Sequence, residues 1–338
     1  MPPRPRSRVS GRRAGADARR VAAYAIRPYR ATDAARVSAL ADGLYPEYRD
    51  DEPGAWRPAE QFDPRNPSPH QLVAVDPTTG EVVGYGGLRT NRMPWARLDL
   101  AVAPAHRRRG LGGRLLGALE DDLQAIGAAS VHARVRADFP DAIAFLTRRG
   151  FVERHRMQGL RLALDDVSEA ALGEHQRVAL DAGYTIVTLA EEMASVRDWR
   201  DRLRALMDAA VDGWPDPDPA PTAPMTPERF AGWLEPALAE PDLVFLAKGA
   251  DGYAGFASVI ALGTAVHPDH RGRGLATALK ARAVADAKRR GLRRVRSCTA
   301  NPAMLAVNEK LGYERDRAEL RLLKLLRAPG GEPGGRPL

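Results

Sequence analysis

The chain has 338 residues, 44% hydrophobic and 28% charged, which is typical of a globular protein long enough for two domains. Its net charge of +8 is concentrated in residues 1–20, where seven arginines and one aspartate leave the remaining chain nearly balanced. This distribution argues against a nucleic-acid-binding fold. We therefore expect residues 1–22 and 329–338 to be disordered tails. A basic arm that contacts nucleic acid or an acidic partner is the weaker alternative.

Cysteine and histidine usage excludes two further classes of protein. Cys298 is the only cysteine, so the chain forms no internal disulfide and no cysteine-based zinc cluster. The histidines lack the spacing of metal ligands, and we predict no metal site. No apolar run is long enough to cross a bilayer, so we expect a cytoplasmic protein that does not contact a membrane.

The most informative feature of the sequence is an internal repeat. The segment "LDLAVAPAHRRRGLGGRLLGAL" begins at Leu98, and "ALGTAVHPDHRGRGLATALKAR" begins at Ala261. Six positions match at one offset of 164 residues. They are Val102, Pro104, Arg107, Gly110, Leu111 and Gly112 in the first half, and Val266, Pro268, Arg271, Gly274, Leu275 and Ala276 in the second.

The elements expected around the repeat also recur in chain order. The halves open on "YAIRPYR" and "YTIVTLAE", then pass through a helix and apolar, β-rich runs such as "HQLVAVD" and "DLVFLAKG". Each repeat then leads into a helix, a short strand, a second helix and a final alternating strand, "LRLAL" or "LRLLKLL". We predict an α/β protein with domains at 23–165 and 183–328, joined by a helix or loop at 166–182.

The second half departs from the first before its repeat. The Pro-rich segment "WPDPDPAPTAPMTP" predicts a loop, because proline fixes the backbone and removes a donor. In "GYAGFASVIALGTAVHP" almost no residues are left for a turn between two strands. This predicts either a shortened hairpin or one continuous strand. The first half has a plausible hairpin turn in "RTNRMP".

The glycine-rich segment of each repeat is typical of an anion site. Glycines allow a strand to turn tightly into a helix, so that free amides at the helix N-terminus meet at one point. Flanking arginines add positive charge, and a diphosphate fits such a site well. Leu115 stands where a dinucleotide fingerprint needs its third glycine, and neither half has the Gly-Lys-Ser/Thr of a Walker loop.

The pattern Arg-x-x-Gly-x-Gly/Ala resembles motif A of the GNAT acetyltransferase superfamily, and the duplication resembles its tandem members such as mycothiol synthase-like proteins. The resemblance implies an α/β fold of two tandem GNAT domains, each a mixed, centrally splayed β-sheet flanked by helices. It implies acetyl-CoA as co-substrate. The residues that it places at the donor are Leu100, Val102, Arg107, Arg109, Gly110, Gly112, Gly113, Arg114, Val266, Arg271, Arg273, Gly274, Ala276, Thr277 and Asn301.

The same resemblance implies direct attack of an amine on the thioester. The oxyanion donor would be a backbone amide near Leu100 to Val102, and the residue that protonates the leaving thiolate is usually a tyrosine. Leu146 and Asn308 occupy the tyrosine positions, so neither half has the phenol, and only Asn308 donates a hydrogen bond. Asn301 matches the asparagine that opens this helix, where the first half has Phe139.

Other polar residues are candidates by position. Asp99 on the central strand is a candidate general base, with an ordinary structural contact as the alternative. His106, His267 and His270 flank the loops and are expected to be solvated, and Thr264 is a weaker candidate. The segment "LYPEYRDDEPGAW" combines acidic and aromatic residues and is either a lid suited to a cationic amine or a solvated loop. Its candidate residues are Tyr45, Glu47, Tyr48 and Trp56.

These observations lead to one main functional hypothesis and two alternatives. The main one is an N-acetyltransferase that acts on a small-molecule amine, with catalysis in both halves or in only one of them. The first alternative is a degenerate scaffold or regulatory protein that binds acyl-CoA without turnover, as the loss of both tyrosine positions suggests. The second is an acetyltransferase that uses the basic tail to associate with nucleic acid.

Overall fold

A computed structural model of the chain describes residues 24–44, 70–89, 95–210, 227–258 and 263–326. The two tails, the candidate lid, the Pro-rich segment and most of the "RTNRMP" turn lie outside these residues. Within the described parts, no helix combines the length and the apolar character that crossing a membrane requires.

The described residues of the first half form six strands and three α-helices. They are β1 (Ala25–Pro28), α1 (Ala34–Leu44), β2 (Gln71–Val75), β3 (Val82–Arg89), β4 (Trp95–Val102), α2 (Leu111–Ile126), β5 (Ser130–Arg136), α3 (Pro140–Thr147) and β6 (Val152–Ala163). Strands β1 to β4 are antiparallel neighbours, whereas β4 and β5 run parallel. The apolar face of α2 packs with α3 on one side of this sheet, and α1 covers β2 and β3 on the other.

The second half repeats this plan after a connecting helix. It contains α4 (Glu169–Asp181), β7 (Thr185–Thr188), α5 (Leu189–Ser195), α6 (Trp199–Ala210), α7 (Pro227–Ala239), β8 (Val244–Gly249), β9 (Gly252–Ser258), β10 (Thr264–Val266), α8 (Leu275–Arg289), β11 (Arg294–Thr299), α9 (Pro302–Lys310), β12 (Glu314–Arg315) and β13 (Glu319–Leu325). The segment predicted as a helix or loop therefore forms the helix α4, whose Leu172 is buried in the same cluster as Val284 of α8.

Strands β10, β9, β8 and β7 form a separate antiparallel sheet in that order. The pairing of β9 with β10 excludes the single continuous strand that we considered for this segment. Ser258 N–H donates to Gly263 O at 2.9 Å, which closes the hairpin at its turn end. Helices α6 and α7 cover one face of this sheet, and α8 covers the other.

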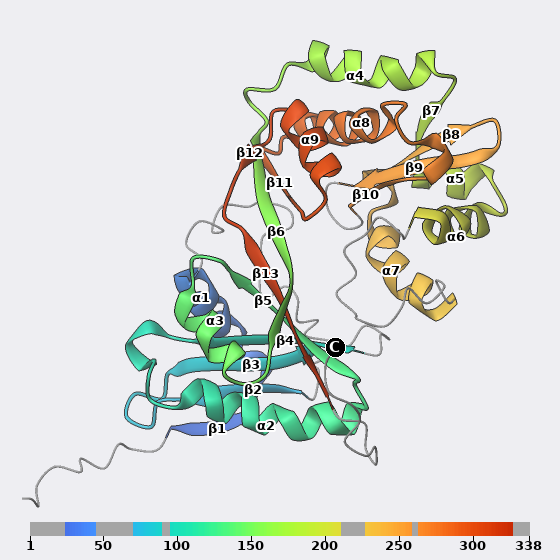
Figure 1. Ribbon diagram of the computed structural model, residues 1–338. Helices are drawn as coiled ribbons and strands as arrows, with labels where there is room; N and C mark the ends of the chain where they lie inside the picture. Colours follow the sequence, from blue (N-terminus) through green and yellow to red (C-terminus); the bar gives the residue numbers. More distant parts are fainter. Residues whose placement is uncertain (1–23, 45–69, 90–94, 211–226, 259–262, 327–338) are drawn as a thin grey trace, which may run out of the picture.

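The halves exchange their last strands. The C-terminal strand β13 lies between β5 and β6 in the sheet of the first half. The long strand β6 leaves β13 after Met157 and pairs through Gln158–Ala163 with β11 of the second half. Figure 1 shows β6 and β13 running side by side between the two halves. The matching sequences "LRLAL" and "LRLLKLL" thus each pair with a strand of the other half, β6 with β11 and β13 with β5, within one large sheet.

Candidate functional site

The glycine loops of both halves have the same backbone geometry. Each strand ends in a short 3-10 turn, at Pro104–His106 and at Pro268–His270, and then reaches a left-handed glycine that caps the helix. Gly110 has a φ of 80° and Gly274 a φ of 77°. No described side chain caps α2 or α8, so the amides of the first helical turn are free to bind an anion. The structure thus brings the predicted loop residues of each half together at one helix N-terminus, whereas Asn301 lies at the start of α9.

Four of the predicted arginines hold the loops themselves. Arg107 Nε donates to Val102 O at 3.1 Å, and Arg271 Nε makes the equivalent bond to Val266 O at 3.2 Å. Arg109 donates to the Tyr24 hydroxyl at 2.7 Å, and Arg273 to that of Tyr184 at 2.8 Å. These bonds turn the guanidinium groups back onto the protein, so the anion site is made chiefly of backbone amides.

Two tyrosines that the sequence did not single out contact the loops, and each bonds to a histidine that was expected to be solvated. Tyr24 Oη lies 2.9 Å from His106 Nδ1, and Tyr184 Oη lies 2.7 Å from His270 Nδ1. The rings of each pair meet edge to face at nearly the same angle, 83°. His106 and His270 are therefore bonded parts of the loops rather than solvated side chains. The signal was the tyrosine that opens both "YAIRPYR" and "YTIVTLAE".

Arg149 lies beside the first loop, and nothing in the sequence had indicated it as a site residue. It follows α3, and a Cβ atom at Gly113 would lie 3.0 Å from its Nη2. Its guanidinium stacks on the Phe145 ring, 3.7 Å from the centroid, and that ring lies against Gly112. Arg149 thus adds a positive charge to the first turn of α2.

The central strands separate where a substrate arm would have to pass. Strands β4 and β5 pair from Trp95–Ser130 to Leu98–Ala133, whereas β4 stays paired with β3 as far as Val102. Ala103 N–H donates to Val83 O, so alternation along β4 turns the backbone groups of Leu100 and Val102 toward the gap. In the second half β10 pairs with β9 and β11 with β6, and no described residue pairs β10 with β11. Thr264 Oγ1 is buried there with no hydrogen-bond partner among the described residues.

Asp99 is buried on β4 between two arginines. One carboxylate oxygen lies 2.8 Å from Arg89 Nη2, and the other lies 3.3 Å from Arg97 Nε. A proton taken up by Asp99 would therefore weaken two ion pairs. The geometry favours a structural part for Asp99, in which it orients the two guanidinium groups.

Neither residue at the tyrosine positions replaces the phenol, and Asn308 Oδ1 is buried with no hydrogen-bond partner among the described residues. Leu146 of α3 lies in the core with α2 and β5. Asn308 of α9 is fully buried, and its Nδ2 donates to Met304 O of the same helix at 2.8 Å. Asn301 caps α9, because its Oδ1 accepts from Ala303 N at 2.9 Å.

The second half contains a buried cation that the sequence analysis did not single out. Lys280 of α8 is 8% exposed, and its ammonium lies 5.3 Å from the centroid of the Tyr313 ring. Burial lowers the pKa of Lys280 to about 8. At the offset of the repeat, the first half has Leu116, which is a core residue. The alignment of Lys280 with an apolar residue of the first half was the signal by which the sequence could have revealed this buried lysine.

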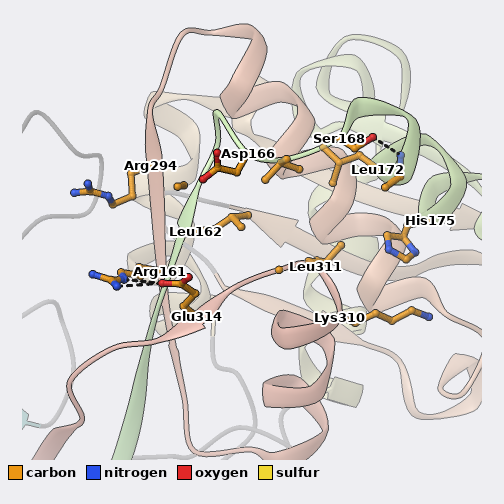
Figure 2. Close-up of a pocket in the computed structure, with 14 residues that line it drawn as sticks. Arg161, Leu162, Asp166, Ser168, Leu172, His175, Arg294, Lys310, Leu311 and Glu314 are labelled. Carbon is orange, nitrogen blue, oxygen red and sulfur yellow. Dashed lines mark hydrogen bonds and ion pairs between the residues drawn. The ribbon is translucent and has the colours of Figure 1, made fainter.

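A cavity of about 610 Å³ lies apart from both loops, between the start of α4 and the ends of β6, β11 and α9 (Figure 2). Arg161 and Glu314 form an ion pair across its wall at 3.1 Å. Figure 2 shows the Arg294 and Lys310 side chains pointing away from each other at opposite ends. None of the predicted site residues lines this cavity.

Comparison with known proteins agrees with the duplicated loop and the separated strands. The model of the acetyltransferase (GNAT) family matches residues 41–151 and again residues 203–313. The chain is 29% identical over 294 residues to a mycothiol acetyltransferase from Cellulomonas flavigena, covering 81% of this chain and 79% of that one. It is 30% identical over 216 residues to a mycothiol acetyltransferase from Clavibacter sepedonicus, covering 61% and 62%.

Solved structures show the same fold at lower identity. A GCN5-related N-acetyltransferase from Sphaerobacter thermophilus superposes with a TM-score of 0.66 at 20% identity, over 91% of this chain and 97% of that one. A tandem GNAT protein from the clavulanic acid biosynthesis pathway gives 0.62 at 22% identity, over 92% and 100%. The two family matches account for the repeat. Each ends at an aromatic residue that follows a glycine, Phe151 in the first half and Tyr313 in the second. The chain belongs to the GNAT acetyltransferase family, in its tandem form.

Proposed function

We propose that the chain transfers an acetyl group from acetyl-CoA to the amine of a small molecule by direct attack. The observation that carries the proposal is the combination, in the first half, of free helix amides at Gly110 with a gap between β4 and β5. The free amides suit the diphosphate of coenzyme A, and Arg149 adds charge beside them. The backbone groups of Leu100 and Val102 suit the pantetheine arm and the thioester in the gap.

In this reaction the acceptor nitrogen forms a bond to the thioester carbonyl carbon, and the carbon–sulfur bond breaks. The nitrogen gives up a proton, and the departing sulfur takes one up. Backbone N–H groups of β4 would stabilise the intermediate oxyanion without any particular side chain. Asp99 keeps two arginines beside the gap, and no described phenol serves the leaving thiolate in either half.

A calorimetric titration of acetyl-CoA into wild type, Gly110→Glu and Gly274→Glu tests the donor sites. Each glutamate places a negative charge and a strained left-handed residue at one loop, so we expect binding stoichiometry to fall in the half that carries it. Gly127→Glu is the matched control, because Gly127 has a φ of 70° and caps the opposite end of α2 from the first loop. Unchanged binding in both loop variants, with binding in wild type, contradicts the assignment of the loops.

A catalytically inactive acyl-CoA-binding protein is the second candidate. The specific observation in its favour is that Leu146 and Asn308 are both buried within their own helical layers. Titration that shows acetyl-CoA binding, together with no coenzyme A release across a panel of amines, favours this candidate. Release that depends on an added amine rules it out.

A further inference from the structure

Two arginines from different strands lie directly opposite each other in the first sheet. Arg134 of β5 pairs with Arg321 of the exchanged strand β13. Their neighbours Ala133 and Leu322 point into the core beneath α2 and α3. Since side chains alternate along a strand, both arginines point to the opposite face of the sheet.

A third arginine joins this face from β4. Arg97 pairs with His132 of β5, so it lies on the same face as Arg134, which is two residues further along β5. The pairing of β4 with β5 ends at Leu98 and Ala133. Arg134 is therefore the first residue of β5 beyond the paired region, at the edge of the gap between the strands.

The positive charges on this face exceed the negative charges. Arg97 and Arg89 share the carboxylate of Asp99, and Arg321 Nε lies 2.9 Å from Glu319. No hydrogen bond or ion pair joins Arg134 to another described residue, and the residue is accessible to solvent. Loss of water around its guanidinium and the charges of Arg321 and Arg97 lower the pKa of Arg134. These four arginines face two carboxylates, which leaves an excess of two positive charges, and Arg134 is the one of the four without a hydrogen bond or ion pair. Arg136, the next arginine of β5 on this face, is paired with Asp138.

Such an arrangement costs stability unless an anion completes it. Like charges directly opposite in neighbouring strands repel each other. A carboxylate or phosphate between Arg134 and Arg321 would remove the repulsion, and the planar guanidinium matches either group with two hydrogen bonds.

We propose that Arg134, flanked by Arg97 and Arg321, binds a carboxylate or phosphate group carried by the amine that the first half acetylates. This inference rests on the proposed function, because the gap beside Arg134 is where the thioester would meet the acceptor. It narrows the acceptor to the class of anionic amines. It also makes the C-terminal strand part of the recognition site of the first half.

Thermal unfolding at low ionic strength with added inorganic phosphate tests the anion site without any enzymatic assay. We expect phosphate to raise the unfolding temperature of wild type, because a ligand of the folded state stabilises it. Arg134→Gln should unfold at a higher temperature than wild type without phosphate, since the repulsion is gone, and should lose the larger part of the phosphate-dependent rise. If Arg134 only stabilised the fold, Arg134→Gln without phosphate would unfold at a lower temperature than wild type.

The matched control is Arg202→Gln, which removes the same charge from the exposed face of α6, where Arg202 pairs with Asp198 at 3.0 Å. Phosphate bound at the two glycine loops contributes equally to all three proteins. Chloride at equal ionic strength separates binding from screening, and acetate in place of phosphate shows whether a carboxylate suffices. Equal phosphate-dependent rises in wild type and Arg134→Gln overturn the proposal, whether or not acetyl-CoA binds.

A second arm links the site to the acceptor. Acetyl transfer is measured with pairs of amines that differ in one group, an amino acid and its uncharged amide. We expect wild type to prefer the acid, and Arg134→Gln to lower kcat/KM for the acid by about tenfold to a hundredfold while leaving the amide unchanged. A preference for the amide in wild type contradicts the proposal, whereas failure of acetyl-CoA to bind contradicts the proposed function instead.

Discussion

The two halves have the same hydrogen bonds in their loops but differ in chemistry at single core positions. The loops agree atom for atom in the bonds of Arg107 and Arg271, yet the positions beneath the helices differ. Leu116 fills the core of the first half, and Lys280 buries an ammonium at the same position of the second. A buried cation without a described carboxylate partner lowers stability, because burial removes its hydration.

We predict that Lys280→Met stabilises the protein at neutral pH. Burial lowers the pKa of Lys280 from 10.5 to about 8, and one pKa unit corresponds to about 1.4 kcal/mol, so a gain on the order of 3 kcal/mol is expected at pH 7. Methionine retains the length of the side chain without its charge. Chemical denaturation of wild type and variant measures the difference.

The pH dependence of this difference has a defined sign. Below pH 8 Lys280 is charged in both folded and unfolded states, so the full cost of burying the charge is present. Between the folded pKa of about 8 and the unfolded value of 10.5, the folded state loses the proton first, and wild type gains stability relative to the variant. If the difference in free energy of unfolding between wild type and Lys280→Met stays constant from pH 8 to 10.5, the buried charge is not its cause.

At the scale of elements, each glycine loop is fastened to the residue before the first strand of its half. Tyr24 precedes β1 and Tyr184 precedes β7, and each hydroxyl contacts both a histidine and an arginine of its loop. The anion site is therefore positioned by a contact between segments more than eighty residues apart. This contact holds the amides in place when no ligand is bound.

We predict that Tyr24→Phe weakens acetyl-CoA binding in the first half and that Tyr184→Phe does so in the second. Each change leaves one arginine without its acceptor and lowers the free energy of unfolding by about 1 kcal/mol. Calorimetry should show several-fold weaker binding at one site only, so each variant is the control for the other. A loss of stability with unchanged affinity would mean that the tyrosine does not position the amides.

The sequence predicts the repeated elements well and the side-chain contacts poorly. The offset of 164 residues locates both loops, both caps and both helices, because glycine at a left-handed position has few substitutes. The bond between Tyr24 and His106 could not be inferred from spacing, since it joins residues 82 apart through the folded sheet. The ion pairs of Asp99 with Arg89 and Arg97 depend on the register between neighbouring strands, and the sequence does not specify that register.

At the scale of the whole molecule, the two halves are not separable along the sequence boundary. Strand β13 contributes the buried Leu320 and Leu322 to the core of the first half, and β6 contributes Leu160 and Leu162 to that of the second. Alternating apolar residues predicted both strands but could not say which sheet each would join. The pattern "LRL" is the same in both, so either pairing satisfies the sequence.

We predict that a fragment of residues 1–166 is insoluble or unfolded alone and becomes folded when coexpressed with residues 167–338. Coexpression with residues 167–318, which lack β13, should not rescue it, because β5 and β6 then have unpaired edges and an incomplete core. Solubility and amide spectra of the labelled first fragment measure the outcome. A first fragment that folds alone would show that the exchanged strand is dispensable.

The position of β13 also sets the order of events during synthesis. The strand that completes the first sheet is translated after all the other described elements of the second half, so β5 and β6 wait for it while that half emerges from the ribosome. Domains usually fold as units in the order of synthesis, the N-terminal one first. Here the first half becomes native only once β13 has emerged, and a chain that stops before Glu319 lacks the strand between β5 and β6.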